Sequence, residues 1–559
     1  MMMGRQVMLP DDILVLIFES MSCIDDEPQE AFKKNLVLLN VCQAWRHAAM
    51  PIAYREVFVH CETSDGCDYA TLTEIYNTQK NLDTTYLVSN AQLVLSADCI
   101  EFVKVADISV CFHTNPLLAV DMVVDCLKSA ANKWQNIRQL AVTMQPSAYA
   151  SYRLLVDIDC YKNDITRSAN EFCNLMPHVR RLGIQGANTN ILARSLCDHL
   201  AGCYADQLNQ LDCRHPIIQP DDVVFKELTD MSIDFDYEYR YGLPRVSAET
   251  LVSLKISNAS AGHSWSAFSH EKDPTVINFP SLRFLDLTYN VGGGATLDSA
   301  EVTKYKHYNY ITLNFPSLKV LYLTNMTKSC PLLQNAVLPS HMERLSITAS
   351  TSVFEQASIL GLPQVKHISL TVGSRARRDD DVFIFVRQIL AQQQKSENTE
   401  LIASNYRLPV HINDIEYISL TCLRIKAPIS VDTMLAFIKR LRKLSSLSLY
   451  GLALDNIQSD ITIPEVSLHS QNHLEPLDTN IKEISICYIT GGYRSQEIVQ
   501  VSAYLMLKIP SLRRFAIVHT LCKPLLDIVA TYTPMYPHLE NLRLQLDEYE
   551  ECFYAGRPH

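Results

Sequence analysis

Apolar residues recur along this sequence in one arrangement: an apolar residue, two intervening residues, a second apolar residue, one intervening residue and a third. Because successive side chains of a strand point to opposite faces, this spacing predicts a short β-strand with one apolar face. Copies preceded by proline span Pro177–Ile184, Pro280–Leu287, Pro316–Leu323, Pro363–Leu370, Pro510–Ile517 and Pro537–Leu544. Copies without that proline begin at Ile137, Leu208, Leu228, Leu251, Ile415, Leu444 and Ile481, and one with an extra residue is centred on Leu345.

Helical patterns lie between many of these strands, at residues 117–134, 190–200, 381–394, 431–444 and 498–509. A strand followed by a helix, repeated mostly every 20–40 residues or so, is typical of a leucine-rich-repeat solenoid, whose stacked units share one core. The chain resembles that family, although the Asn or Cys usual after the strand is replaced, for example by Thr288 and Thr324. The resemblance implies an α/β solenoid over residues 136–559, a horseshoe with a parallel sheet on its concave side. A set of unrelated α/β units is the alternative.

The N-terminal region has a different pattern, with helices that are apolar on more than one side. Pro10 and the two acids after it favour a helix start, and apolar residues then run without a break from Ile13 to Phe18. A second helix is expected over residues 32–50, ending before Pro51. Two such short helices are too small to fold alone, so their surplus apolar surface must meet the rest of the chain or another protein.

The order of apolar residues in this region resembles an F-box over roughly residues 7–60. The resemblance implies that residues 1–60 bind the Skp-type adaptor of an SCF ubiquitin ligase and, through it, cullin. The adaptor-binding residues that it implies are Leu9, Pro10, Ile13, Leu14, Ile17, Phe18, Leu38, Val41 and Trp45. The connection at residues 23–35 is longer than a minimal F-box requires. Alternatively, the two helices are a cap over the first unit of the following domain.

Composition narrows the classes of partner. The net charge of −12 argues against general binding to nucleic acid or to anionic membranes, since both reward clustered Lys and Arg. No apolar run approaches the length of a membrane span, and no secretory signal is visible before Asp11. The 17 cysteines are scattered and often apolar in context, which suits free thiols in the cytoplasm or nucleus.

No catalytic or cofactor motif emerges from the sequence. Phosphate-binding glycine loops, paired zinc spacings and nucleophile elbows are all missing, so we expect a non-enzymatic protein without metal or cofactor. Cys61, Cys67 and His60 make a poor metal set because no second pair follows. The arginines at 375, 377 and 378 fit a solvated turn better than a docking contact for an acidic or phosphorylated substrate. Residues 61–135 are expected to form a linker and a first, atypical repeat.

Residues that flank the middle apolar position of each repeat should lie on the concave face of the solenoid. Aromatic and arginine side chains there are the usual anchors of an interface. The predicted substrate-binding residues are Phe284, Asp286, Tyr322, Tyr417, Glu483, Arg514 and Arg543. An F-box followed by such repeats implies a substrate receptor that holds an unknown protein for ubiquitination. A scaffold that binds the adaptor without any role in ubiquitination is the main alternative, and an enzyme on an α/β scaffold is a second.

Overall fold

The computed structural model describes residues 37, 39, 43–63, 85–112, 116–146, 158–186, 190–213, 225–234, 249–259, 276–289, 312–326, 336–360, 362–372, 382–393, 395–403, 420–453, 476–490, 502 and 504–517. These residues form a mixed α/β structure with a large, mostly parallel sheet. The chain divides into two compact units. Unit 1 comprises residues 1–284 and 295–316, and unit 2 comprises residues 285–294 and 317–559.

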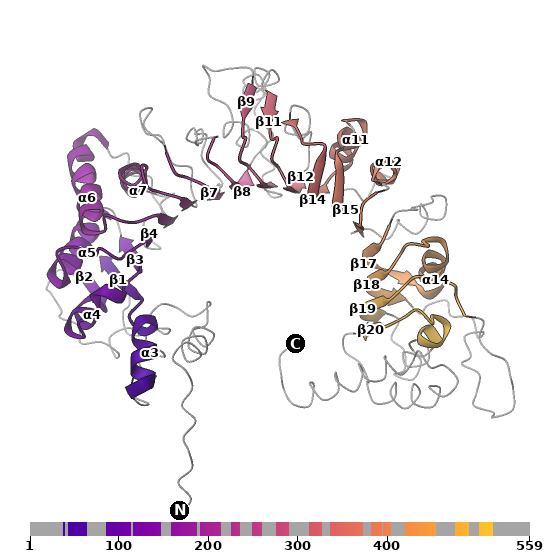
Figure 1. Cartoon of the computed structure of the whole chain (residues 1–559), viewed down its shortest axis with the longest axis horizontal. Helices are drawn as coiled ribbons and strands as arrows, with labels where there is room; N and C mark the ends of the chain where they lie inside the picture. The colour runs from indigo at the N-terminus through magenta and orange to yellow at the C-terminus, as the bar shows by residue number, and fades with distance from the viewer. Residues whose placement is uncertain are drawn as a thin grey trace, which may run out of the picture. The chain divides into compact units, whose positions relative to one another are not determined.

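The sheet of unit 1 follows the order of the chain, except at its first edge (Figure 1). Strand β2 pairs antiparallel with β1, and β1 pairs parallel with β3; each later strand up to β8 then pairs parallel with its predecessor. The short strands β9 and β11 form a separate parallel pair. The bounds are β1 Glu56–Thr63, β2 Thr85–Ser89, β3 Val105–Phe112, β4 Gln139–Pro146, β5 Arg181–Gln185, β6 Gln210–Cys213, β7 Asp230–Asp234, β8 Ser253–Ala259, β9 Val276–Asn278 and β11 Thr312–Asn314.

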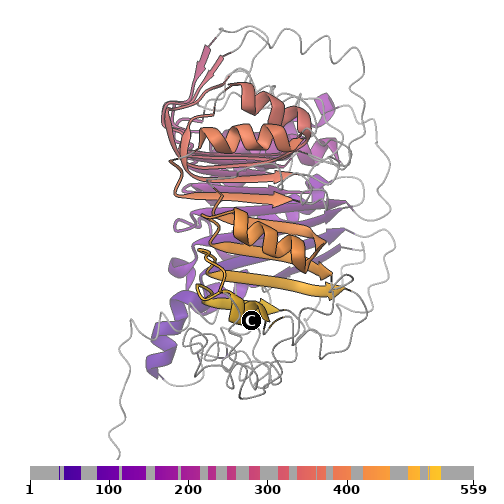
Figure 2. The same ribbon diagram turned by 90° about the vertical axis from the view of Figure 1, so that its right-hand side faces the viewer.

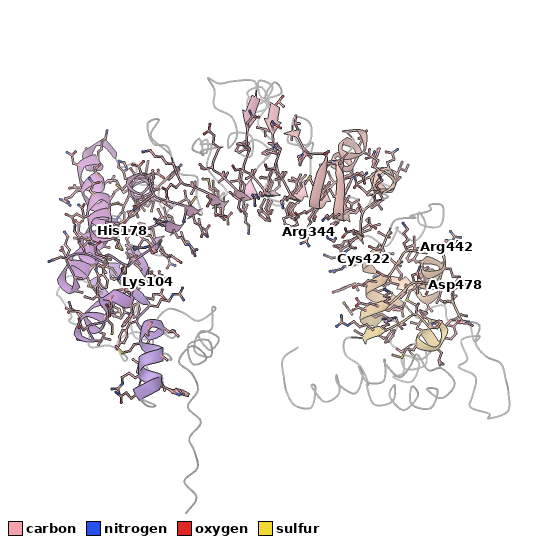
Figure 3. All side chains as sticks on the ribbon, viewed as in Figure 1. Lys104, His178, Arg344, Cys422, Arg442 and Asp478 are labelled. Atoms are coloured by element: carbon pink, nitrogen blue, oxygen red, sulfur yellow. The ribbon has the colours of Figure 1, made fainter. Side chains whose placement is uncertain are left out.

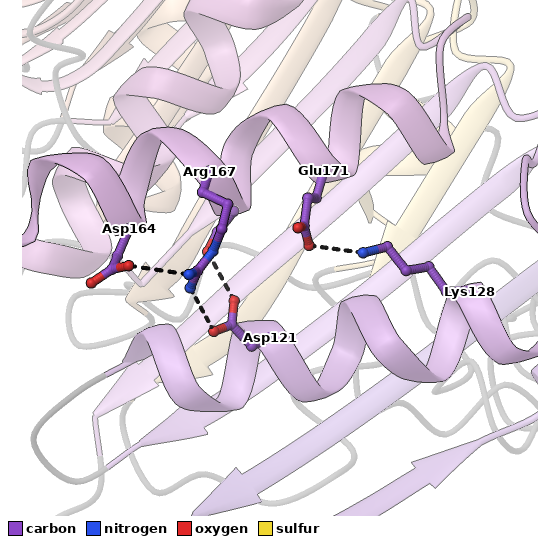
Figure 4. Close-up of polar contacts among 6 residues, drawn as sticks. Asp121, Lys128, Asp164, Arg167 and Glu171 are labelled. Atoms are coloured by element: carbon purple, nitrogen blue, oxygen red, sulfur yellow. Dashed lines mark hydrogen bonds and ion pairs between the residues drawn. The ribbon is translucent and has the colours of Figure 1, made fainter.

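Helices cover one face of this sheet and pack against one another. Helix α5 contacts β1, β3 and α6, and α6 contacts α7. Charged side chains join α5 to α6: Arg167 binds Asp121 at 3.1 Å, and Lys128 binds Glu171 at 3.0 Å (Figure 4). The helices are α3 Gln43–Ala53, α4 Ala91–Ser96, η1 Ile100–Phe102, α5 Pro116–Ala130, η2 Ile158–Tyr161, α6 Lys162–Leu175 and α7 Ile191–Cys203.

The apolar spacing read from the sequence determines which side chains enter the core. In β3 every second residue is buried, and Ile108 and Phe112 lie on the helical face. The same alternation puts Leu182 and Ile184 of β5 in the core, as the repeat pattern predicted. The indole of Trp134 is also buried, and its nitrogen donates a hydrogen bond to the carbonyl of Leu127 at 3.3 Å. The described helices lie on one face of the sheet (Figure 1), and we call the opposite face the helix-free face.

Unit 2 is built in the same way from parallel strands in chain order, from β12 through β20. Its helices contact the strands from one face, which Figure 2 shows in orange in front of the sheet. Ser430 caps α14 by accepting a hydrogen bond from the Thr433 amide at 3.2 Å. The bounds are β10 Phe284–Tyr289, β12 Val320–Met326, β13 Ala336–Val337, β14 His341–Ala349, α11 Thr351–Leu360, β15 Gln364–Val372, α12 Val382–Gln392, β16 Asn398–Ala403, β17 Cys422–Ser430, α14 Val431–Arg440, β18 Ser446–Ala453, β19 Glu483–Thr490 and β20 Arg514–Ile517.

The structure differs from the sequence-based expectation at the start of the sheet. Strand β1 begins at Glu56, inside the predicted F-box. Strand β3 lies within residues 61–135, where a first, atypical repeat was expected, and Ala106 stands there at a position where other copies carry a larger apolar residue. Helix α3 also continues through Pro51, which was expected to follow its end. Pro51 has no amide hydrogen to donate, but helical bonding continues beyond it, with the amide of Tyr54 donating to the carbonyl of Met50 at 3.0 Å.

The repeat that was expected to begin at Ile415 lies outside the described residues up to its last apolar position, Leu420. The described strand that follows is Cys422–Ser430, with buried Leu420, Leu423 and Ile425 at the same apolar spacing. Leu423 lies between Leu401 of β16 and Leu447 of β18.

Candidate functional site

The helix-free face of the unit 2 sheet carries a continuous row of polar side chains, one from each strand. We call it the polar row. In register from β12 to β20 it contains Tyr322, Ser346, Ser369, Glu400, Cys422, Ser446, Glu483 and Arg514. Three serines stand among three charged groups, a tyrosine and a cysteine. The row therefore presents both donors and acceptors of hydrogen bonds.

Glu400 is the centre of the polar contacts in this row. Its carboxylate accepts a hydrogen bond from Ser369 at 2.8 Å and forms an ion pair with Nε of Arg424 at 2.8 Å. The thiol of Cys422 lies 3.8 Å from the same carboxylate, and burial, followed by the charge of Glu400, raises the pKa of that thiol. Figure 3 labels Cys422 in unit 2. These contacts hold the side chains in a defined arrangement before any partner binds.

The structure brings together two of the predicted substrate-binding residues. Glu483 and Arg514 are exposed neighbours in the polar row and form an ion pair of 3.5 Å. Tyr322 lies in the same row, where its hydroxyl accepts a hydrogen bond from Arg344 at 3.2 Å. The carboxylate of Asp286, on β10, accepts a hydrogen bond from Thr288 at 3.3 Å. Phe284 is the first residue of β10 and is half-buried, whereas Tyr417 and Arg543 lie outside the described residues.

Sequence reasoning missed Glu400 and the groups around it. Strand β16 carries Thr399 where the other repeats carry a large apolar residue, so the repeat pattern did not detect it. Its pairing with the next strand is also displaced by two residues, because Leu401, the last apolar residue of β16, lies opposite Leu423, the middle apolar residue of β17. Arg344 could have been found, since it precedes Leu345, the middle apolar residue of a predicted repeat.

Unit 1 carries a cluster of ionisable groups on the helix-free face of β1 and β3. Burial raises the pKa of Glu56 to about 7; the nearby charge of Asp107 adds to this effect and Arg55 opposes it. Burial likewise raises the pKa of Asp107, against a lowering effect of His60. His60 lies 4.0 Å from Glu62. Carboxyl groups of this kind can exchange protons near neutral pH, but a catalytic site would also need a pocket around them.

The geometry of β1 argues against a metal site at His60, Cys61 and Cys67. His60 and Cys61 are consecutive strand residues, so their side chains point to opposite faces of the sheet. Cys61 is fully buried, and this burial raises its pKa to about 12. Cys67 lies outside the described residues. Among the residues that the structure describes, no group of three or more His, Cys, Asp or Glu side chains is arranged to hold a metal ion.

A pair of neighbouring thiols lies on the helical face of unit 1, Cys173 on α6 and Cys203 at the end of α7. A hydrogen bond from the thiol of Cys173 lowers the pKa of Cys203. Cys203 is exposed, and its sulfur lies 3.4 Å from the side-chain oxygen of Asn170. A lowered pKa favours the thiolate form of a cysteine.

Of the predicted adaptor-binding residues, only Trp45 lies within the described part of the chain. It sits on α3, is half-buried and packs with Leu39 and Ile52 against buried Ala48 and Ala49. The remaining eight lie outside it, namely Leu9, Pro10, Ile13, Leu14, Ile17, Phe18, Leu38 and Val41.

Comparison with known proteins gives no family for this chain. No family model and no curated protein matches the sequence. None of the described helices is both long and apolar enough to span a membrane.

Proposed function

We propose that this chain is a non-catalytic substrate receptor of an SCF-type ubiquitin ligase, with an N-terminal F-box and a leucine-rich-repeat solenoid that binds a target protein. The observation that carries the proposal is the regular succession of parallel strands, each with the same buried apolar positions. In unit 2 these strands follow one another in chain order, with the ladder Leu321, Leu345 and Ile368 at one level. A repeating parallel sheet with helices on one face is how leucine-rich repeats share a core.

The N-terminal helix supports the adaptor-binding part of the proposal. Trp45 is only half-buried on α3, and Val37, shortly before that helix, exposes 65% of its surface. Apolar groups left accessible at a short helical segment are the kind of surface that a partner subunit covers. The polar row of unit 2 supports the other part, because ordered carboxylate, guanidinium and hydroxyl groups provide specific hydrogen bonds to a target.

A receptor of this kind accelerates ubiquitin transfer by position. The adaptor holds one end of the chain and the repeats hold the target, so the target stays near the transferring enzyme. This raises the effective concentration of the target at the enzyme, and the receptor itself carries out no chemical step.

The test is co-purification of the full chain with a Skp-type adaptor. Replacing Leu14→Asp puts a charge into the proposed contact and should reduce the captured adaptor by about tenfold or more, since a buried unpaired charge is costly. Leu118→Asp is the matched control, because Leu118 lies on α5 and already exposes 60% of its surface. Undiminished adaptor capture by Leu14→Asp would contradict the proposal.

Point substitution is preferable to removing residues 1–60. That deletion would take away the first residues of β1, including Val57 and Val59, which are buried against the helices of unit 1. Loss of adaptor binding would then report on unfolding. A reconstituted ubiquitination assay separates the receptor from the scaffold, because the scaffold captures the adaptor without any increase in ubiquitin on captured partners.

A further inference from the structure

The rim of the unit 1 sheet, where its strands begin, carries four cations at the same position of four adjacent strands. We call Arg55, Lys104, Arg138 and Arg180 the basic rim. Backbone hydrogen bonds fix their order. The amide of Lys104 donates to Arg55 at 2.7 Å, that of Arg138 to Lys104 at 2.8 Å, and that of Arg180 to Arg138 at 2.8 Å. The four cations therefore lie on neighbouring strands, whose backbones are about 4.8 Å apart.

The four side chains are exposed, and none takes part in an ion pair with another described residue. Acidic residues also lie nearby, and the charge of Arg55 acts on Glu56. Lys104 reaches the backbone carbonyl of Glu101 at 3.4 Å, and Glu56 follows Arg55 directly in the chain. Arg138 is oriented by the carbonyl of Gln135, at 2.7 Å, which leaves most of its guanidinium pointing outward for another acceptor. Figure 3 labels Lys104, the second cation of the row.

In unit 2, the residues at the same rim position of four adjacent strands carry charges of both signs. Lys319, Glu343, Lys366 and Glu397 alternate in sign along adjacent strands, and Lys319 binds Glu343 at 2.8 Å. We call this the alternating rim. The hydrogen bond from Lys319 and its charge, with a contribution from Lys366, lower the pKa of Glu343. The rim of β12 to β16 thus alternates in sign, whereas the basic rim carries four like charges. Farther along unit 2, Lys482 and Arg513 are adjacent cations at the same position before β19 and β20.

We propose that the basic rim binds an extended segment of a partner protein that carries about four or five consecutive acidic residues. Four strands span about 14 Å, and an extended peptide covers that distance in about four residues. The cations are spread along a line, one to a strand, and do not converge on a point as a phosphate site requires. Arg181, exposed beside Arg180, widens the same surface.

The test of this surface does not depend on the proposed ligase role, since binding is measured on the full chain without any adaptor. The probe is a fluorescent peptide with about five consecutive Glu residues, followed by fluorescence polarisation at low and at moderate salt. Lys104→Gln with Arg180→Gln should weaken binding by about tenfold or more. The matched control, Lys319→Gln with Lys366→Gln, removes the same charge from the same position in unit 2 and should change binding by less than about twofold. Arg180→Lys should retain binding.

Three results would overturn the proposal. The first is no measurable binding of the Glu peptide. The second is equal weakening by the two paired variants, which would show a response to bulk charge only. The third is a clear preference for a peptide with phosphoserines in place of the Glu run, or for a single-stranded oligonucleotide, which would assign the rim to another ligand class. Circular dichroism and the melting temperature of each variant show that the fold is retained.

Discussion

The two units of this chain use the same apolar repeat but treat the rim of the sheet differently. The basic rim of unit 1 places four like charges side by side, whereas the alternating rim of unit 2 places an acid beside each cation and forms the ion pair Lys319–Glu343. Like charges on neighbouring strands destabilise a sheet, and opposite charges stabilise it. The basic rim therefore retains a repulsion that the alternating rim lacks. An anionic partner would relieve the repulsion within the basic rim. The comparison therefore contrasts a rim whose charges favour binding with a rim whose charges favour stability.

The largest effect that we predict tests whether the two units pack their cores in the same way. Leu211→Ala in β6 and Leu447→Ala in β18 each remove a fully buried side chain at the same repeat position. Each substitution should lower the free energy of unfolding of its unit by about 2–5 kcal/mol, because a cavity forms between packed strands and helices. Denaturant titration followed by hydrogen exchange of the two units measures it. A loss below about 1 kcal/mol in one unit only would show that the cores are not equivalent.

The second prediction contrasts two glutamates on the helix-free faces. Burial raises the pKa of Glu56 to about 7 in the folded chain, above its ordinary value of 4.5. Between these pH values the folded state binds more protons than the unfolded state, so stability falls as the pH rises and the penalty is complete above pH 7 or so. Glu56→Gln should therefore raise the free energy of unfolding by about 2 kcal/mol at high pH, after allowing for partial exposure, and by almost nothing at low pH.

Glu483 in unit 2 provides the control for this experiment. It is exposed and paired with Arg514, so Glu483→Gln should change stability little and should not stabilise the chain at high pH. Thermal melts at about pH 4 and about pH 8 are sufficient. Equal behaviour of the two variants would mean that Glu56 is solvated like its counterpart.

The sequence predicted the repeating strands well because their apolar spacing is a local property. Leu182, Ile184 and Leu345 are buried as the pattern required. It failed in β16, where the polar Thr399 takes the apolar position, and it gave β3 only as an atypical repeat, because the small Ala106 stands there. The basic rim was visible in the sequence only as scattered Lys and Arg residues. Their proximity depends on which strands pair and in what register, and that information is not local.

The smallest effect concerns the rims themselves. Lys104→Glu with Arg180→Glu gives the basic rim the alternating order of unit 2. It should raise the free energy of unfolding by roughly 0.5–1 kcal/mol at low salt, because three repulsive neighbours become attractive. Most of this gain should disappear at about 1 M salt, where the screening length falls to about 3 Å. The reverse exchange in unit 2, Glu343→Lys with Glu397→Lys, should destabilise the chain and show the opposite dependence on salt. If the exchange in unit 1 destabilised the chain at low salt, its cations would already be neutralised within the protein, and the contrast between the rims would not mark a binding surface.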